Sequence, residues 1–360
     1  MIKTNTKKIC IVVSSLGGGG AERSSALLSE ILHDLNYEIH MVSVLDIIDY
    51  SFKGKLLNLG KLKAENDSFF GRIKRLIVLR KYLNKHKFDY ILDGRSRIGF
   101  VKELIISKYA YLGFKCIYLF HSYRVENYIH PNKILGRFLY ANAYKNIAVS
   151  HGIKTKLETR YGFTNVVAVY NSLGVEITEQ KESTTNKYIL FYGRLDDKIK
   201  NITLLLNAYR LSVLREKSID LMILGSGNDL EELKHLTHRL ELERYVHFLP
   251  YRSNPYETVQ NAIFTVLTSR YEGFPMVIPE SLALGVPVVS VDCKSGPNEI
   301  IINEENGLLV ENHNAEALAE AMNRMVEDKA LYLHCKSNAK ASVEKFSKQN
   351  IGLQWQSILN

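Results

Sequence analysis

Hydrophobic positions follow two alternating patterns along the chain. Short apolar runs, such as "KKICIVV" near the N-terminus, are followed by segments in which Leu and Ile recur every three or four positions. The first of these segments carries Leu27, Leu28, Ile31, Leu32 and Leu35. Apolar runs next to glycine predict buried strands, and a spacing of three to four predicts amphipathic helices. The alternation of the two predicts an α/β protein built on parallel, doubly wound sheets.

The alternation occurs in two successive series. In the first, short buried strands are predicted at 88–94, 114–122 and 146–152, and the pattern then loosens over 163–185, which we interpret as a linker. The second series begins with "KYILFYGRL" and continues with strands at "DLMILGSG", "VHFLP", "FTVLTS" and "GVPVVSVD", with helices predicted at 201–216 and 228–242. Residues 314–360 contain only helical patterns. Two Rossmann-like halves are therefore expected.

Composition agrees with two soluble domains. The chain has 360 residues, of which 46% are hydrophobic and 24% charged, as in globular proteins. Four scattered cysteines without a CxxC pair fit a reducing cytosol. The N-terminal apolar run is too short for a signal-peptide core, and no stretch approaches the roughly 20 apolar residues of a membrane span. We expect a cytoplasmic protein, soluble or peripheral on the inner face of the cytoplasmic membrane.

Positive charge is concentrated in the first half. Residues 1–175 contain 27 Lys and Arg against 13 Asp and Glu, whereas residues 176–360 contain 20 against 25. The densest basic segment, "GRIKRLIVLRKYLNKHK" at 71–87, has near-helical apolar spacing. Either it lies on an anionic membrane surface, or it is a packed surface helix with solvated charges. No nucleic-acid-binding pattern is present, and no nucleic acid partner is expected.

Two glycine loops follow predicted strands. In "SSLGGGGAER", Gly18 and Gly19 would let the backbone approach an anion at a helix N-terminus. The loop lacks the Lys of a Walker sequence, and Glu22 replaces the last glycine of GxGxxG. In "LMILGSGND", Gly225 and Gly227 could pack against a base or ribose. A flexible turn is the alternative for the first loop, and plain turn chemistry explains the second loop equally well.

A third loop, "YGRLDDKIKN", carries cations. Gly193 permits a tight turn, and Arg194 and Lys200 could converge on a diphosphate, with Arg giving forked contacts and Lys a point charge. The alternative is a solvated loop in which these cations pair with Asp196 and Asp197. The spacing alone does not decide between the two.

The stretch "RYEGFPMVIPESLALGVPVVS" places two carboxylates around a helix start. A helix that begins near Met276, after Pro275, would offer free amides to a phosphate. Glu272 precedes that helix start, and Glu280 lies about one turn inside. Carboxylates accept hydrogen bonds from vicinal hydroxyls, so one could hold a sugar and the other a ribose. The alternative is an acid favoured by the helix dipole together with a surface Glu.

Together these segments resemble the retaining glycosyltransferases of family 4 (GT4), which have the GT-B fold. The resemblance rests on "YGRLDDKIKN", "GSG", "SRYEGFPMVIPESLALGVPVVSVDCKSGPNEII" and "NGLLV", with "GGGGAER" similar to the first loop of that family. It implies an α/β protein with two Rossmann-like doubly wound domains facing across a cleft. Residues 1–170 would bind the acceptor and residues 171–343 the nucleotide sugar, with the helix 344–360 crossing back to the first domain.

The resemblance also implies roles for individual residues. Arg194 and Lys200 would hold the diphosphate and stabilise the departing nucleotide, and Glu272 would bind sugar hydroxyls. His121, at the end of a predicted strand, would lie near the transferred sugar, where it positions the sugar or acts as a base; a lone His is otherwise more often structural. The donor-binding residues would be Gly18, Gly19, Gly225, Gly227, Gly273, Phe274, Met276, Val277 and Glu280.

The function expected is transfer of a hexose or N-acetylhexosamine, with retention, from a nucleoside-diphosphate sugar to a lipid-linked glycan acceptor in bacterial surface polysaccharide or lipopolysaccharide biosynthesis. The segment "SGPNEI" favours UDP. No metal or other cofactor is expected, because the chain has no Asp-x-Asp and the pair His235 and His238 lacks a third ligand. The alternatives are a GT-B nucleotide-sugar epimerase and a non-catalytic subunit that binds nucleotide sugar or membrane.

Overall fold

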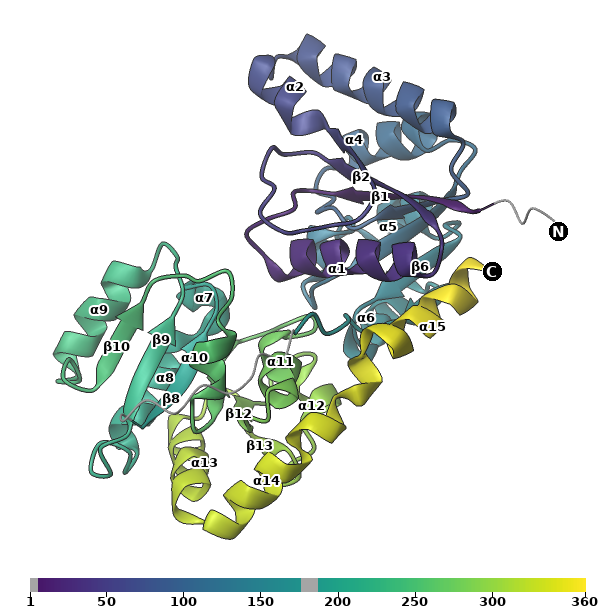
Figure 1. Cartoon of the computed structure of the whole chain (residues 1–360). Coiled ribbons are helices and arrows are strands. Elements are labelled where there is room, and N and C mark those ends of the chain that lie inside the picture. The colour runs from purple at the N-terminus through teal and green to yellow at the C-terminus, as the bar shows by residue number, and fades with distance from the viewer. Residues whose placement is uncertain (1–5, 176–186) are drawn as a thin grey trace. The chain divides into compact units, whose positions relative to one another are not determined.

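The chain folds into two compact units in a computed structural model that describes residues 6–175 and 187–360 (Figure 1). The first unit contains the residues up to Ser172 together with Lys348–Asn360. The second unit is Leu173–Ser347. Each unit is built around its own parallel sheet, so each is described by itself.

The first unit has a seven-stranded sheet in the order β3-β2-β1-β4-β5-β6-β7, and all neighbouring strands are parallel. The central strands are buried on both faces, which explains their unbroken apolar runs. The strands are β1 (Lys8–Val13), β2 (Glu38–Ser43), β3 (Lys55–Asn58), β4 (Tyr90–Asp93), β5 (Lys115–Phe120), β6 (Lys145–Ala148) and β7 (Val166–Ala168).

Helices cover both faces of this sheet. The long helix α1 packs against the last helix of the chain, α15, whose Trp355 is 3% exposed in the core. The connections from β3 to β4, from β4 to β5 and from β5 to β6 are right-handed crossovers. Their helices therefore lie on the face of the sheet opposite to α1. The helical elements are α1 (Gly20–Asp34), α2 (Leu59–Glu65), α3 (Phe69–His86), α4 (Phe100–Ile105), the π-helix η1 (Ile106–Ala110), the 3-10 helix η2 (Val125–Asn127), α5 (Lys133–Tyr140), α6 (His151–Tyr161) and α15 (Lys348–Leu359).

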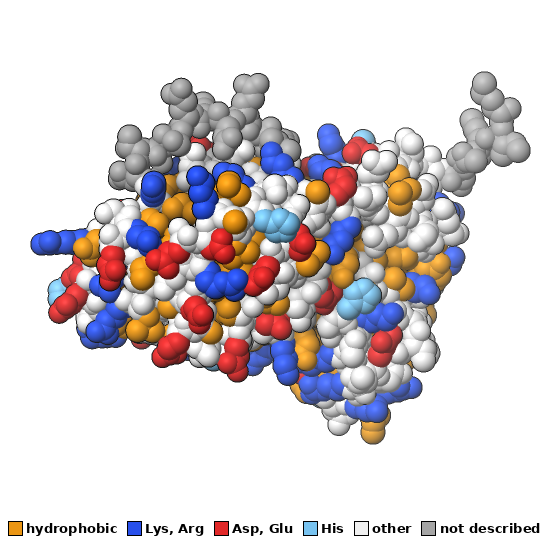
Figure 2. Space-filling view, turned by 90° about the horizontal axis from the view of Figure 1, so that it is seen from below, with side chains coloured by type: hydrophobic (Ala, Val, Ile, Leu, Met, Phe, Trp, Pro, Cys, Tyr) orange, Lys and Arg blue, Asp and Glu red, His pale blue; other side chains and the backbone are white. Residues whose placement is uncertain are grey.

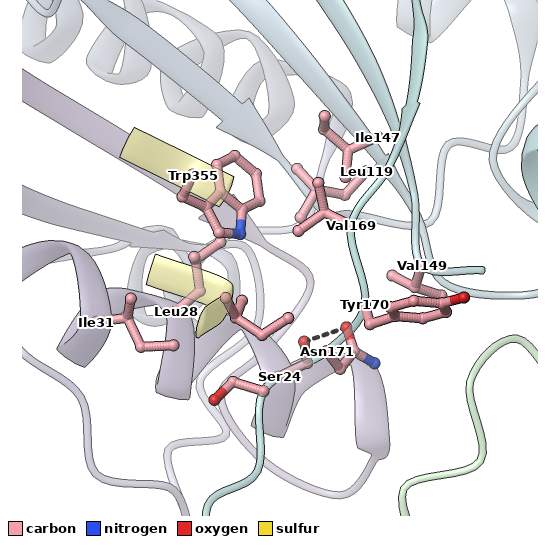
Figure 3. Close-up of a pocket in the computed structure, with 12 residues that line it drawn as sticks. Ser24, Leu28, Ile31, Leu119, Ile147, Val149, Val169, Tyr170, Asn171 and Trp355 are labelled. Carbon is pink, nitrogen blue, oxygen red and sulfur yellow. Dashed lines mark hydrogen bonds between the residues drawn. The ribbon is translucent and has the colours of Figure 1, made fainter. Parts of the chain in front are cut away.

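A small cavity lies between α1, the sheet and α15 (Figure 3). Leu28, Ile31 and Trp355 line its apolar side, and Ser24 donates a hydrogen bond of 2.6 Å to Oδ1 of Asn171 on its polar side. The cavity has a volume of about 20 Å³, which is enough for about one water molecule. A cavity of this size has no room for a sugar nucleotide.

The second unit has a six-stranded parallel sheet in the order β10-β9-β8-β11-β12-β13. Separate apolar clusters cover its two faces, a large one under α8 and α13 and a smaller one that contains Tyr188 and Tyr192. The strands are β8 (Tyr188–Tyr192), β9 (Asp220–Leu224), β10 (Val246–Leu249), β11 (Thr265–Leu267), β12 (Val288–Val291) and β13 (Gly307–Val310). The helical elements are α7 (Asp197–Lys200), α8 (Ile202–Leu211), α9 (Leu230–Arg239), α10 (Tyr256–Gln260), α11 (Val277–Ala283), α12 (Pro297–Ile300), α13 (Ala315–Glu327), α14 (Lys329–Ser342) and the 3-10 helix η3 (Glu344–Phe346).

Three details differ from the sequence-based expectation. The strand β7 lies within the stretch 163–185 that was interpreted as linker, because its three residues complete the edge of the first sheet beside β6. The edge strands β3 and β13 were not predicted, because both are partly exposed and neither forms an unbroken buried apolar run. The rest of the expected linker, 176–186, lies outside the described residues. The expected closing helix 344–360 is divided, because residues 344–347 belong to the second unit and α15 begins at Lys348.

Candidate active site

The predicted donor residues of the second unit lie in loops that follow strands. Because the strands are parallel, the loops after β8, β9, β11 and β12 lie at the same edge of the sheet. Arg194 follows β8, and its side chain is exposed. Glu272 follows β11, and the segment that begins at Cys293 follows β12. The fold thus gathers these segments although up to a hundred residues separate them in sequence.

Lys200 and Glu272 are in direct contact. Nζ of Lys200 lies 2.6 Å from Oε1 of Glu272, and the hydroxyl of Ser269 donates to the same oxygen at 2.6 Å. The two charged side chains are 20% and 14% exposed. The alternative in which Lys200 pairs with Asp196 or Asp197 is therefore wrong, because its partner is 72 residues away. The pair keeps a cation and a carboxylate together at a partly open surface.

The backbone around Lys200 is held by further hydrogen bonds. The carbonyl of Lys200 accepts a hydrogen bond of 2.8 Å from Thr268 Oγ1. Asn201, between α7 and α8, has a left-handed conformation with φ of 52°. The carboxylate of Asp197 accepts from the amide and the hydroxyl of Thr203, both at 2.8 Å. Asp197 thus fixes the turn that carries Lys200. Ser269 and Thr203 were not predicted from the sequence, although the Ser in "TSRYEG" stands only three residues before Glu272.

The loop after β12 braces the turn that follows Glu272. The amide of Glu272 donates to the carbonyl of Lys294 at 2.9 Å, and Ser295 Oγ donates to the carbonyl of Gly273 at 3.2 Å. Gly296 has φ of 104°, and a Cβ there would collide with the ring of Pro275. Only glycine fits this position, which explains the SGP sequence after β12.

Phe274 contributes to the same region through its backbone. Its ring is 5% exposed and packs edge-to-face on Phe346 at 5.1 Å. A ligand could therefore meet the Phe274 amide but not its ring. The side chain anchors the turn in the core of the second unit.

The helix α11 begins at Val277 with Met276 as its N-cap residue, as the Pro275 position predicts. Its first turn is held by Tyr192 Oη and Ser281 Oγ, which both donate to the carbonyl of Val277 at 2.7 Å. Glu280 is only 2% exposed. It is not the surface Glu of the alternative interpretation: its carboxylate lies in the interior, one turn from the helix start.

Gly225 and Gly227 are required by packing between two loops. A Cβ on Gly225 would overlap the Gly193 carbonyl, and one on Gly227 would overlap the Leu195 carbonyl. The loops are joined by hydrogen bonds of 3.0 Å from the Gly193 amide to Leu224 and 2.9 Å from the Leu195 amide to Ser226. Close backbone approach within the protein thus explains both glycines, whether or not a ligand also meets them.

His121 follows the last residue of β5 in the first unit. Neither of its ring nitrogens contacts solvent or has a hydrogen-bond partner among the described residues. Burial, with a smaller contribution from the charge of Arg97, lowers the pKa of His121 to about 4. A Cβ on Gly94 would lie 3.4 Å from Nε2 of His121, so the loop after β4 closes over the ring. The imidazole is therefore neutral near pH 7, with one nitrogen able to donate and the other to accept.

Arg97 lies near His121 and was not found from sequence. It is 2% exposed, and its guanidinium lies 5.0 to 5.5 Å from the ring centres of four aromatic residues. It donates to the carbonyls of Asp93 at 2.7 Å and Leu119 at 3.1 Å. The four rings belong to Tyr118, Phe120, Tyr128 and Tyr140. The only signal in the sequence is an Arg-x-Arg directly after a buried strand.

A buried ion network supports this loop. Nη2 of Arg95 lies 2.6 Å from Asp93 and 3.0 Å from Glu103. Burial alone would raise the pKa of Asp93, but Arg95 and Arg97 hold it below its usual range. All of these groups are inside the first unit. The network holds the loop after β4 against the end of β5, next to His121.

Gly18 and Gly19 lie between β1 and α1. Gly18 has φ of 81°, which favours glycine, and Gly19 is the N-cap residue of α1 in an extended conformation. A Cβ on Gly18 would meet no atom within 4 Å, whereas one on Gly17 would overlap the Asp49 carboxylate. Gly17 is thus required by packing, and Gly18 by its backbone conformation. Across residues 6–175 and 187–360, no group of three or more His, Cys, Asp or Glu could hold a metal ion.

The charge state of His121 predicts a pH effect on stability. Its folded pKa of about 4 lies below the ordinary value of about 6.5, so the unfolded chain takes up the proton first as the pH falls. The unfolding free energy of the first unit should therefore drop by about 2 kcal/mol between pH 7.5 and pH 5 because of this residue. The measurement is urea unfolding at both pH values, followed by the fluorescence of Trp355, the only Trp in the chain, which is buried in this unit.

The variant His121→Asn isolates this contribution, because other groups such as His40, whose pKa is also lowered by burial, are common to both proteins. The variant should lose about 2 kcal/mol less than the parent between the two pH values. Equal losses would show that His121 does not carry a lowered pKa.

Comparisons with known proteins agree on one family. Residues 175–342 match the profile described as glycosyl transferases group 1. Over 96% of this chain and 97% of the relative, the sequence is 31% identical to the N-acetylgalactosamine-N,N'-diacetylbacillosaminyl-diphospho-undecaprenol 4-alpha-N-acetylgalactosaminyltransferase of Campylobacter jejuni. An uncharacterised glycosyltransferase of Haemophilus influenzae is 24% identical over 98% of this chain and all of the relative.

Solved structures show the same fold. A mutant of TarM from S. aureus, in complex with fondaparinux, alpha-GlcNAc-glycerol and UDP, superposes with a TM-score of 0.80 at 17% identity, over 99% of this chain and 100% of that one. HepE from Anabaena, in complex with UDP, gives 0.77 at 19% identity, over 98% and 99% of the two chains. This chain therefore belongs to the group 1 glycosyltransferases and has their GT-B fold.

Proposed function

We propose that this glycosyltransferase moves a hexose or N-acetylhexosamine from a UDP-sugar to a lipid-linked glycan acceptor in bacterial surface glycan biosynthesis, with retention at the anomeric carbon and without a metal ion. The work would take place at the inner face of the cytoplasmic membrane. The observation that carries the proposal is the contact between Lys200 and Glu272 beside the start of α11. It puts a cation for the leaving group next to a carboxylate for sugar hydroxyls.

Lys200 serves the leaving group in this mechanism. When the bond between the anomeric carbon and the diphosphate breaks, negative charge develops on the diphosphate oxygens. A fixed cation and oriented amides stabilise that charge without reorganising, which is the work that a metal ion does in other enzymes. Lys200 is fixed by the 2.6 Å contact with Glu272, and Arg194, on the loop after β8, supplies the second cation.

Glu272 and Glu280 bind hydroxyls. Glu272 already accepts from Lys200 and Ser269 through one oxygen, Oε1, so Oε2 can take a sugar hydroxyl. Glu280 serves the ribose, and the amides of Gly273, Phe274, Met276 and Val277 serve the donor. A ribose hydroxyl would donate to the carboxylate of Glu280, which lies in the interior one turn from the start of α11.

Retention requires little acid–base chemistry from the protein. The acceptor hydroxyl forms the new bond on the face from which the diphosphate departs, and its proton passes to a leaving phosphate oxygen. His121, with a pKa lowered to about 4 by burial, is a weak base. Its neutral ring is better suited to hold a sugar hydroxyl than to remove the proton.

The known relatives support the choice of nucleotide and acceptor. The name of the C. jejuni relative contains a diphospho-undecaprenol-linked sugar, and two of the superposed structures contain UDP. The described residues contain no helix long and apolar enough to cross a bilayer. A lipid-linked acceptor would then be reached by peripheral binding.

Donor binding can be tested by thermal shift with nucleotides and nucleotide sugars in the presence of EDTA. Ligand at a hundredfold excess over its Kd stabilises the folded state by about 2.7 kcal/mol, so a clear rise in Tm is expected with UDP and with one UDP-sugar. A shift that needs added metal would refute metal independence. No shift with any nucleotide would remove the donor assignment, and conversion of the donor without acceptor would indicate an epimerase instead.

A further inference from the structure

Exposed apolar side chains are concentrated on three helices of the first unit. Six of them form what we call the three-helix face: Phe69 and Phe70 at the start of α3, Ile98 just before α4 and Val101 in its first turn, and Ile134 and Phe138 on α5. Their exposed fractions run from 57% to 77%. Large aromatic and aliphatic groups so exposed, and gathered on neighbouring helices, mark an interaction surface.

The six residues lie on the outer side of one helical layer. On α5 the exposed residues Ile134 and Phe138 stand four apart, on one face of the helix. The ring of Phe138 lies 6.4 Å from that of Phe100 on α4, and Lys108 of η1 lies over it at 5.3 Å. Arg80 joins α3 to the end of η1 through hydrogen bonds to two carbonyls. The helices are thus packed together beneath the exposed side chains.

The three-helix face lies toward the same sheet edge as His121. In a parallel sheet, each crossover helix begins near the carboxyl end of the strand before it. Phe69, Ile98 and Ile134 stand at or next to helix N-termini, and His121 directly follows β5. An acceptor that is anchored in a surface bound to the three-helix face would approach the sheet edge where His121 lies.

Charge on the surrounding surface is almost entirely positive. Residues 69–138 contain 15 Lys and Arg and only 4 Asp and Glu. Of these acids, Asp93 and Glu103 are buried in the network with Arg95, and Asp89 precedes β4 at the opposite sheet edge. The fourth, Glu126, is paired with Lys156 and Arg160, and Asp67, just before α3, is paired with Arg72 and Arg75. Figure 2, a view of the molecule from below, shows Lys and Arg side chains beside hydrophobic ones on the right-hand part of the surface. The exposed cations close to the face include Arg72, Lys102, Lys108, Lys133 and Arg137.

We propose that the three-helix face docks on an anionic phospholipid bilayer, with its six apolar side chains in the interfacial region and the cations over lipid headgroups. Apolar side chains and Lys or Arg without acids are the combination that binds anionic membrane surfaces. This inference rests on the proposed use of a lipid-linked acceptor. It also refines the hypothesis for residues 71–87: α3 packs on the protein through Leu79 and Leu83, and its membrane contact is confined to its first turns.

The test is co-sedimentation of the full chain with phosphatidylcholine vesicles with and without a third of phosphatidylglycerol. We expect binding only with the anionic lipid, weakened by high salt. The double variants Phe69→Ser/Phe70→Ser and Ile134→Ser/Phe138→Ser should each lower the partition coefficient by about tenfold or more. The matched control is Leu353→Ser, which changes an equally exposed apolar residue on α15, in the layer on the other face of the sheet, and should bind as the parent does.

Equal binding to both vesicle types, or unchanged binding of the two double variants, would overturn the proposal. Oligomeric state is measured on the same samples without lipid. A dimer that both double variants abolish would show that a second copy covers the face. Thermal shift with UDP, which needs neither lipid nor acceptor, reports donor binding separately, so that failure of membrane docking is distinguished from failure of the proposed function.

Discussion

Replacing Lys200 with alanine should lower kcat/KM for sugar transfer by about 10²- to 10³-fold while the protein stays folded. The reason is that Lys200 stabilises charge that develops only as the diphosphate departs, and loss of one such group costs that much in other enzymes. The position is partly exposed, and after the substitution Glu272 still accepts from Ser269, so we expect little loss of stability. The measurement is steady-state transfer to acceptor, with Tm as the check on folding.

Lys198→Ala is the matched control for this experiment. Lys198 lies on the same short helix, α7, and is exposed. It should leave transfer unchanged. Glu272→Gln should reduce transfer strongly as well, and the double variant should lose less than the sum of the two losses, because the two side chains contact each other. Full activity of Lys200→Ala would end the assignment of this site.

Replacing Arg97 with methionine should destabilise the first unit by about 3–5 kcal/mol. The substitution removes one of the two cations that compensate the buried Asp93 and takes the guanidinium from among four aromatic rings, and breaking a buried ion pair from one side costs about this much. Urea unfolding followed by Trp355 fluorescence measures this unit specifically. Because the chain has two units, a signal from the whole chain would mix two transitions.

Two further variants make this result specific to Arg97. Arg124→Ala changes an exposed cation of the same unit and should stay within about 0.5 kcal/mol of the parent. Arg97→Lys keeps a charge but loses the forked hydrogen bonds to the carbonyls of Asp93 and Leu119, so it should rescue only part of the loss. If Arg97→Met unfolds at the same urea concentration as the parent, the buried network does not hold this unit together.

The local pattern was sufficient for the order of the buried strands. Strands such as β1 and β12 are buried on both faces, so they appear in the sequence as unbroken apolar runs. The helix after Pro275 was also predicted from a local signal, because proline is favoured next to a helix start. Short edge strands carry no such signal: β3 is half exposed and contains Lys55, and β7 has only three residues.

In the candidate site, too, local sequence signals could be recognised and contacts between distant segments could not. Glycines and charged loops after strands can be recognised in one dimension, and the segment around Glu272 was identified by its residue types and spacing. Their partners could not be, because each partner comes from another crossover of the sheet: Lys200 meets Glu272 across 72 positions, and the loop at Ser295 braces the turn at Gly273. Arg97 was missed because a charged residue in a loop is usually solvated, and only the surrounding strands bury it.

By itself, the sequence determined the α/β class, the two successive series of strands and helices and the family, and it predicted the segments that we propose carry the chemistry. All of these depend on residues close together along the chain, through hydrophobic period, turn residues and local motifs. Tertiary structure alone decided that Lys200 is paired with Glu272, that Glu280 is buried, that His121 is neutral beside Arg97, and that apolar side chains of three helices share one face. The physical reason is that burial and pairing are set by contacts between distant segments, which form only when parallel strands bring their carboxyl ends to one edge.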